Sequence, residues 1–185
     1  MKLTVVIALF CAAALPSACG ASSTHRTTTQ RATTQTTSQS CKGAQLSGRF
    51  AAVAGSAGAG NISYALALKN VSKAICTISG LPAGQLLGKR GGKLPTHIRA
   101  EHPNQLTAVL VRLRPGASAR ATARFSPDVP GTGEPVMGNR CEPVAYRLRV
   151  SAPGGGTVNT GIAPATSVCE HGRMFFSAYS LSRRL

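Results

Sequence analysis

The sequence of 185 residues contains no tryptophan, and aromatic residues make up only 4% of it. A hydrophobic core built from this chain must therefore consist mostly of Val, Leu, Ile and Ala side chains. Acidic residues are also scarce, with five Asp and Glu against 21 Lys and Arg, which gives a formal net charge of +16 at pH 7. So few carboxyl groups leave little material for the paired-carboxylate chemistry of a glycosidase.

Motifs that would indicate an enzyme are also missing. No Cys-x-x-Cys pair is present, so a redox-active dithiol is not expected. The glycine-rich basic segment 88–93 carries Arg90 after Lys89, where a phosphate-binding P-loop requires Ser or Thr. Cys169 lies close to His171, but we expect Cys169 to be oxidised and unable to act as a nucleophile. We therefore predict a protein without catalytic residues and without a cofactor.

The N-terminal segment predicts export from the cell. Lys2 is followed by 13 residues, from Leu3 to Leu15, that carry no charge. This run is long enough for the apolar region of a signal peptide and too short to cross a bilayer as a helix. No later stretch is apolar enough to cross one either. We expect residues 1–21 to be a signal peptide and the mature protein to be extracytoplasmic.

The end of this segment leaves two modes of export open. Small residues precede Cys19, as they do at a lipoprotein processing site, where the cysteine becomes the lipidated first residue. Such sites usually carry leucine three places before the cysteine, and here Pro16 stands at that place. Ordinary cleavage after Gly20 or Ala21 is the alternative. The product is therefore either a cell-surface lipoprotein, anchored in the membrane through Cys19, or a freely secreted protein.

Residues 22–40 form a polar segment made mostly of Ser, Thr and Gln, with Ala32 as its one apolar residue. Such a composition cannot bury enough apolar surface to offset the entropy lost on ordering. We expect a disordered linker, which behind a lipid anchor would act as a stalk that holds the domain of residues 41–185 off the membrane.

The domain shows the period-two pattern of β-strands. In segment 62–70 the apolar face consists of Ile62, Tyr64, Leu66 and Leu68, and Pro and Gly residues mark the junctions between such runs. No segment keeps a helical period over three turns. The pattern predicts seven or eight short strands and an all-β fold, a single antiparallel β-sandwich of immunoglobulin-like type.

Four cysteines in the domain predict a disulfide framework, because their number is even and the chain is routed to an oxidising compartment. They are Cys41, Cys76, Cys141 and Cys169. Three pairings are open to four cysteines. Because Cys41 and Cys76 flank one predicted hairpin, and Cys141 and Cys169 a second, we favour these two pairs. Each bridge would stabilise the fold by roughly 3.5 to 4 kcal/mol.

Several short segments of the domain form a series that covers nearly all of residues 41–185. In order they are Cys41, Leu66-Ala67-Leu68-Lys69-Asn70, Cys76-Thr77-Ile78-Ser79-Gly80-Leu81-Pro82, Leu113-Arg114-Pro115-Gly116-Ala117-Ser118-Ala119-Arg120, Cys141 and Cys169. With this series the chain resembles domain of unknown function 4232, an actinobacterial family of secreted proteins and lipoproteins. The resemblance implies a β-sandwich at the cell surface with no established activity, and it adds no catalytic residue.

The basic residues give the main indication of function. On three predicted strands arginines alternate with core residues and should point away from the core, and a basic loop adds to them. These residues are Arg112, Arg114, Arg120, Arg124, Arg147, Arg149, Lys89, Arg90 and Lys93. We expect them to attract an anionic polymer of the cell envelope or the headgroups of acidic lipids. The plain alternative is that a GC-rich genome uses arginine freely at outward positions that must be polar anyway.

Two other functions are less favoured. Nucleic acid is not an expected partner, because stacking aromatic residues are not interleaved with the basic ones and an exported protein seldom meets nucleic acid. A metal-binding protein or enzyme of the envelope is the alternative function, with a site built from isolated residues such as His97, Glu101 and His102. Solvated loop histidines are the simpler interpretation of that segment, so no metal ligand is assigned. The oligomeric state stays open.

Overall fold

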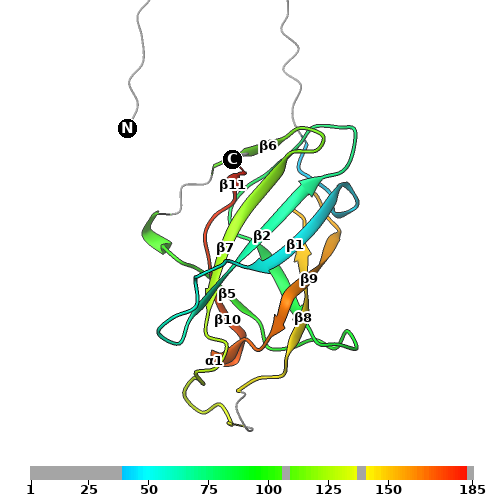
Figure 1. Cartoon of the computed structure of the whole chain (residues 1–185). Coiled ribbons are helices and arrows are strands. Elements are labelled where there is room, and N and C mark those ends of the chain that lie inside the picture. Colours follow the sequence, from blue (N-terminus) through cyan, green and yellow to red (C-terminus); the bar gives the residue numbers. More distant parts are fainter. Residues whose placement is uncertain (1–38, 106–108, 137–140, 183–185) are drawn as a thin grey trace, which may run out of the picture. The chain divides into compact units, whose positions relative to one another are not determined.

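The computed structural model describes residues 39–105, 109–136 and 141–182, so that the predicted signal peptide, Cys19 and the linker as far as residue 38 lie outside the described residues. The described chain is mostly β (Figure 1). Its strands are β1 (Leu46–Ala52), β2 (Ile62–Asn70), β3 (Cys76–Ile78), β4 (Ala83–Leu87), β5 (His97–Ala100), β6 (Val111–Leu113), β7 (Ser118–Phe125), β8 (Ala145–Ser151), β9 (Thr157–Thr166), β10 (Arg173–Phe176) and β11 (Ser180–Leu181). Short helical turns occur at η1 (Gly43–Gln45), η2 (Pro103–Gln105) and α1 (Cys169–Gly172). None of the helices in these ranges has the length and apolar character needed to cross a membrane.

One mixed sheet dominates the described part of the chain. Its strands lie in the order β4-β8-β9-β1-β2-β7-β10-β5, and β11 also pairs with β7. Most neighbours are antiparallel, but β1 runs parallel to β9, and β10 runs parallel to β5. Strands β3 and β6 form a separate antiparallel pair. The expectation of a β-rich domain is confirmed, whereas the expectation of a purely antiparallel fold is wrong.

The two edge strands of this sheet are linked by the segment that connects them. The backbone N–H of Leu94 donates to the carbonyl of Leu86 in β4 (3.0 Å), and the N–H of Leu86 donates to Oγ1 of Thr96, directly before β5 (2.9 Å). The sheet is therefore nearly closed and barrel-like. It does not divide clearly into the two stacked sheets that define an immunoglobulin-like sandwich, because one hydrogen-bonded path leads from β4 to β5.

The parallel contacts arise from two strands that the sequence pattern does not predict. In β9 the side chains of Val158, Thr160 and Ile162 are buried in alternation, but Gly161 and Pro164 hide the strand character of the segment. Strand β5 is only four residues long and lies just behind Pro95. Each of these strands forms because neighbouring strands supply its hydrogen-bond partners and cover its inward-facing side chains. Sequence periodicity alone does not reveal such neighbours.

The few aromatic residues of the chain are concentrated in its core. Phe50 and Tyr64 have ring centroids 5.2 Å apart, Tyr64 and Phe125 also 5.2 Å, and Phe50 and Phe176 6.1 Å. All four side chains are buried. The buried positions of β7 before Phe125 are alanines, which leave room for these rings on the neighbouring strands. The core thus relies on aromatic packing more than the composition indicates.

The end of β2 is fixed by a buried side chain. Asn70 has no exposed surface, and its Nδ2 donates to the carbonyls of Ala74 (2.7 Å) and Leu113 (3.0 Å). Its Oδ1 accepts from the backbone N–H of Ser72 (3.0 Å) and from the Ser72 hydroxyl (2.7 Å). The amide therefore satisfies its own hydrogen-bonding groups and joins β2 to β6, which agrees with the role of asparagine at strand ends.

Two disulfides join distant segments of the domain. Cys41 is bonded to Cys76 at the start of β3, with a Cα–Cα distance of 4.9 Å. Cys141, shortly before β8, is bonded to Cys169 in α1, with a Cα–Cα distance of 5.5 Å. These are the two pairs favoured from the sequence. Their presence is consistent with an extracytoplasmic protein.

Candidate functional site

Two of the predicted arginines project from β8. Arg147 is exposed and Arg149 is half-buried, and both flank the fully buried Leu148. The guanidinium Nε of Arg149 donates to Oδ1 of Asn159 in β9 (3.2 Å). By its alternation with Arg147 and Arg149 in the sequence, Tyr146 is expected to face the core together with Leu148, and this expectation is wrong: a bulge between Ala145 and Arg147 leaves the residue 39% exposed.

The basic loop 88–93 lies beside these arginines and forms a hairpin directly after β4 in the sequence (Figure 1, green, next to β8). Its turn is closed by hydrogen bonds from the N–H of Gly88 to the carbonyl of Gly92 (2.9 Å) and from the N–H of Gly91 to the carbonyl of Gly88 (2.9 Å). A guanidinium nitrogen of Arg147 donates to the carbonyl of Lys89 (3.1 Å), which connects the loop to β8. We call the five basic residues of this region the hairpin patch: Lys89, Arg90, Lys93, Arg147 and Arg149.

The charges of the hairpin patch are not neutralised by acidic side chains within the described residues. Ion pairs in these ranges join Arg124 to Glu101 (3.4 Å) and Arg173 to Glu170 (3.6 Å), and Nδ1 of His171 lies 3.9 Å from Glu134, a contact that is an ion pair only when the ring is protonated; none includes a residue of the patch. Most of the five acids of the chain are thus engaged elsewhere. The patch is therefore a local concentration of positive charge on a framework of sheet and hairpin.

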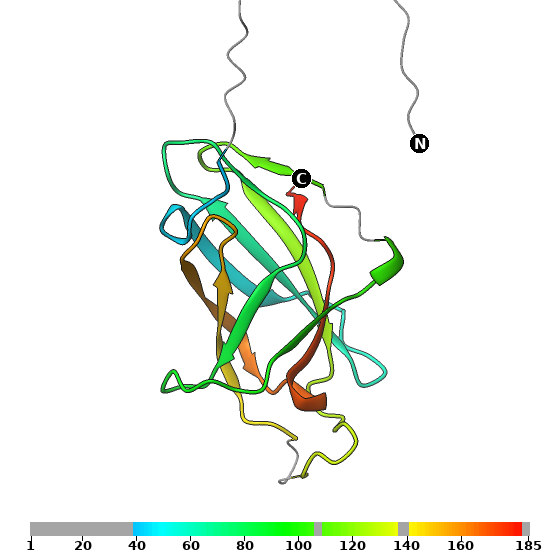
Figure 2. The ribbon, with the colours of Figure 1, turned by 180° about the vertical axis from the view of Figure 1, so that it is seen from behind.

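The remaining predicted basic residues lie elsewhere. Arg120 is exposed on β7, whereas Arg124 on the same strand pairs with Glu101 and stacks over the ring of Phe175 (5.3 Å from its guanidinium carbon to the ring centroid). The exposed Arg112 lies in β6, and the exposed Arg114 directly follows that strand in the sequence. Both views place β6 at one end of the domain and the green hairpin 88–93, which follows β4 in the sequence, at the opposite end (Figure 1 and Figure 2). The nine predicted residues therefore do not form one continuous surface.

A second group of polar side chains surrounds the Cys141–Cys169 disulfide and is not predicted from the sequence. Glu134 is buried, and its carboxylate accepts three backbone N–H groups. Oε2 accepts from Gly131 (2.6 Å) and Glu170 (2.8 Å), and Oε1 accepts from His171. Burial alone would raise the pKa of Glu134, but these donors and the nearby imidazole outweigh burial and hold the pKa below its ordinary value.

The donors of this carboxylate come from an unusual turn. Glu170 (φ +56°) and His171 (φ +58°) both adopt the left-handed conformation, followed by Gly172 (φ +77°). Side chains other than glycine seldom adopt this conformation, because Cβ then crowds the backbone. Here the turn directs two neighbouring N–H groups toward one anion, which is the geometry of a backbone anion-binding nest. Glu134 occupies that nest from within the same chain.

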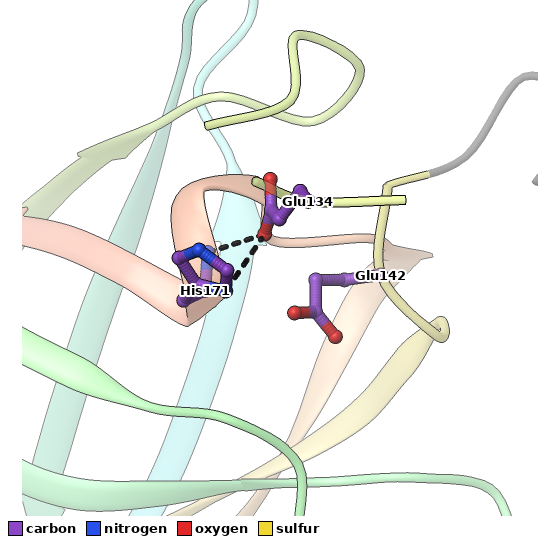
Figure 3. A group of neighbouring side chains, drawn as sticks. All are labelled: Glu134, Glu142 and His171. Carbon is purple, nitrogen blue, oxygen red and sulfur yellow. Dashed lines mark hydrogen bonds and ion pairs between the residues drawn. The ribbon is translucent and has the colours of Figure 1, made fainter. Parts of the chain in front are cut away.

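Two further groups converge on Glu134 (Figure 3). Glu142 follows Cys141, and the ligand atoms of Glu134, Glu142 and His171 all lie within 4.8 Å of one another. Burial, together with the neighbouring Glu134 carboxylate, raises the pKa of Glu142. Two carboxylates and an imidazole at such distances can share a proton or hold a cation.

The sequence offered one indirect signal for this group. Glu142 and His171 stand one and two places from the cysteines of a disulfide, so pairing Cys141 with Cys169 brings them near each other. Glu134 carries no comparable signal.

The metal-binding residues considered from the sequence are not brought together. His97 and His102 are exposed, and Glu101 pairs with Arg124 (3.4 Å). Within the described residues, Glu134, Glu142 and His171 are the one group whose ligand atoms lie close enough to share an ion. Cys169 is disulfide-bonded, as expected, and is not a free nucleophile.

The comparison with protein families identifies the domain. The family model described as "Domain of unknown function (DUF4232)" matches residues 41–177, from the first disulfide cysteine to just behind β10. No curated protein and no solved structure matches the chain. The match covers well over half of the sequence, so the chain belongs to the DUF4232 family, as its ordered series of motifs indicates.

Proposed function

We propose that this protein is an exported, non-enzymatic module of the cell envelope that binds an anionic polymer or the headgroups of acidic lipids through the hairpin patch. One observation carries the proposal: among the described residues, no carboxylate lies within 4.0 Å of a basic nitrogen of the patch. A cluster of unneutralised positive charge attracts an anionic surface across about 8 Å at physiological ionic strength.

The backbone that carries the patch supports this proposal. Arg147 and Arg149 project from β8, which lies between β4 and β9 in the sheet. Lys89 and Arg90 lie in a hairpin that is closed by backbone hydrogen bonds and joined to Arg147. Basic groups on such a framework lose less backbone entropy on binding than the same groups on a flexible tail. Arg149 also keeps its orientation through Asn159.

The proposal includes the location of the domain outside the cytoplasm. We propose a lipid anchor at Cys19, with secretion after cleavage behind Gly20 or Ala21 as the alternative. An anchor would tether the basic domain to the membrane, so that it can return to the lipid headgroups, where each basic residue at the surface contributes about 1 kcal/mol to binding. The intact mass of protein taken from the native membrane fraction distinguishes the two, because only the lipoprotein is a diacylated chain that begins at Cys19.

Binding is tested with two probes, vesicles that contain phosphatidylglycerol and soluble polyphosphate. The variant combines Arg147→Glu with Arg149→Glu, which reverses two charges at the centre of the patch. We expect its affinity for the favoured probe to fall at least about tenfold, since each lost basic contact near an anionic surface removes about 1 kcal/mol. The affinity of the unaltered protein should fall steeply as salt rises. Preference for vesicles or for polyphosphate tells a lipid from a polymer.

The matched control combines Arg112→Glu with Arg114→Glu. It makes the same change in net charge, but the β6 strand lies at the opposite end of the domain from the hairpin of residues 88–93 (Figure 2). We expect this control to lose much less affinity than the patch variant. Equal losses in both variants would mean that net charge alone drives binding, and the patch would have no special role. Absence of binding at low salt, or binding that salt does not weaken, would contradict the proposal altogether.

A further inference from the structure

Glu134, Glu142 and His171 form a group that the proposed binding to anions does not use. They come from three separate segments: Glu134 follows β7 in the sequence, Glu142 precedes β8, and His171 belongs to the turn α1. One ligand atom from each lies within 4.8 Å of the other two. The Cys141–Cys169 disulfide joins the last two segments directly beside the group.

The backbone donors leave one acceptor position of the Glu134 carboxylate to side chains or a ligand. An ionised carboxylate can accept about four hydrogen bonds, two at each oxygen. Oε2 accepts from the N–H groups of Gly131 and Glu170, whereas Oε1 accepts one, from His171. Oε1 is also the oxygen that lies 3.9 Å from Nδ1 of the His171 ring. The lone pair that the backbone donors leave over therefore belongs to the oxygen that lies near Nδ1 of His171.

The His171 ring is oriented by a contact outside the group. Its Nε2 lies 3.3 Å from the carbonyl oxygen of Thr132. A carbonyl oxygen can only accept, so this contact requires the proton on Nε2. In the neutral ring Nδ1 then carries the lone pair, and Nδ1 is the nitrogen near Glu134. Metal-binding histidines usually donate their second ring nitrogen to a carbonyl or carboxylate in this way.

The charges of the group favour a positively charged occupant. The Glu134 carboxylate is held in its ionised form by three N–H donors, and the carboxylate of Glu142 lies next to it. The two like charges repel each other unless a proton or a cation lies between them.

We propose that Oε1 of Glu134, the carboxylate of Glu142 and Nδ1 of His171 bind one zinc ion, with water completing the coordination. Two ligands of a tetrahedral zinc lie about 3.3 Å apart, given bonds of about 2.0 to 2.1 Å. The side chains of Glu142 and His171 therefore need to close in by at most about 1.5 Å, and both are partly exposed at the surface. Calcium needs six to eight oxygen ligands, and magnesium prefers oxygen ligands and water, so an imidazole with two carboxylates favours zinc.

A zinc ion at this place would reinforce the disulfide. It would connect the loop of Glu134 to the segment of Glu142, while the Cys141–Cys169 bond connects that segment to the turn of His171. The zinc would join all three segments, and the segments of Glu142 and His171 would then be joined twice, by the ion and by the disulfide. Binding of the ion to the folded state alone would also raise the melting temperature of the protein.

The test uses the exported protein with both disulfides formed, and its probe is zinc chloride at about pH 7.5 in competition with a chromophoric chelator. We expect one zinc per chain and a higher melting temperature with zinc. Glu142→Gln and His171→Asn should each lower the zinc affinity tenfold or more, as loss of a ligand does. Asparagine is chosen because it tolerates the left-handed backbone of residue 171.

The matched control combines Glu101→Gln with His102→Asn, which makes the same two kinds of change at residues that are not part of the group. We expect its zinc affinity to equal that of the unaltered protein. Zinc affinity that is lost in this control, or that persists in Glu142→Gln and His171→Asn, would overturn the proposal, and so would the absence of stoichiometric zinc. Calcium that competes with zinc at equal concentration would also overturn it. If a variant fails to form its disulfide, the zinc-dependent shift of the His171 ring resonances in the unaltered protein decides the question.

Discussion

Oε2 of Glu134 lies 2.8 Å from the backbone nitrogen of Glu170, a residue 36 positions later in the chain. The same carboxylate also accepts the N–H groups of Gly131 and His171. Glu170 and His171 both have the left-handed backbone that side chains disfavour. The turn that bears the disulfide cysteine Cys169 thus depends on one buried charge from a distant loop.

Glu134→Ala should destabilise the fold more than any other replacement of an acidic residue. It leaves three N–H donors without their acceptor in a partly buried place, and each donor that water does not reach costs about 1 to 3 kcal/mol. Urea unfolding in the presence of a metal chelator measures the loss. Glu142→Ala is the control and should change the free energy of unfolding by less than about 1 kcal/mol, because no backbone donor among the described residues bonds to its carboxylate. A Glu134→Ala variant as stable as the unaltered protein would show that the turn holds itself.

Stability should depend on pH through Glu142 in a direction set by its raised pKa. Burial and the Glu134 carboxylate raise this pKa above the ordinary value of 4.5. The folded protein then binds the proton more tightly than the unfolded chain, so the contribution of Glu142 falls as the pH rises from 4.5 through the raised pKa. Glu142→Gln removes this fall. With a chelator present, we expect the variant to gain stability relative to the unaltered protein between about pH 4 and pH 7.

Zinc should reverse the sign of the stability difference between Glu142→Gln and the unaltered protein. When zinc is in excess, ionised Glu142 is a ligand. The stability of the unaltered protein should then increase relative to that of the Glu142→Gln variant as the pH rises. Parallel melting curves with chelator and with zinc measure both arms. A difference between the two proteins that does not vary with pH in either arm would show that the carboxyl group titrates alike in the folded and unfolded states.

The buried tyrosines offer a matched pair of substitutions. The hydroxyl of Tyr64 donates to the carbonyl of Pro164 (2.8 Å), whereas the hydroxyl of Tyr179 is buried without a hydrogen-bond partner among the described residues. Tyr64→Phe should therefore destabilise the protein by about 1 kcal/mol, while Tyr179→Phe should be neutral or stabilising, because it removes an unsatisfied polar group. Urea unfolding of the two variants tests this opposition. Equal losses would mean that both hydroxyls are satisfied.

The sequence predicts the strands whose pattern is local. Segment 62–70 alternates without interruption and is β2 over those same residues, and Asn70 closes it as expected. The disulfide pairing also follows from sequence order, because each pair flanks a short excursion of the chain. These features depend on neighbours in the sequence, for which periodicity and spacing are sufficient guides.

Features that depend on distant parts of the chain could not be predicted. Strand β9 contains Gly161 and Pro164 and is a strand because β1 and β8 lie on either side of it. The side chain of Tyr146 turns outward at a bulge that only the pairing of β8 with β9 reveals. Glu134 and His171 are far apart in the sequence and carry no motif, so their contact is a result of the folded chain alone.

The Cys141–Cys169 disulfide should be needed for the zinc site and not only for stability. Its removal by Cys141→Ser with Cys169→Ser opens a loop with a sequence separation of 28 residues, which the chain-entropy relation equates with about 3 to 4 kcal/mol. Removal of the other bridge, by Cys41→Ser with Cys76→Ser, opens a loop of similar separation, 35 residues, and should cost a similar amount. We expect zinc affinity to fall only in the first variant, because Glu142 and His171 adjoin that bridge alone. Titration with zinc at a temperature where both variants remain folded checks this. A loss of affinity in both variants would mean that zinc binding responds to general destabilisation rather than to the bridge beside the site.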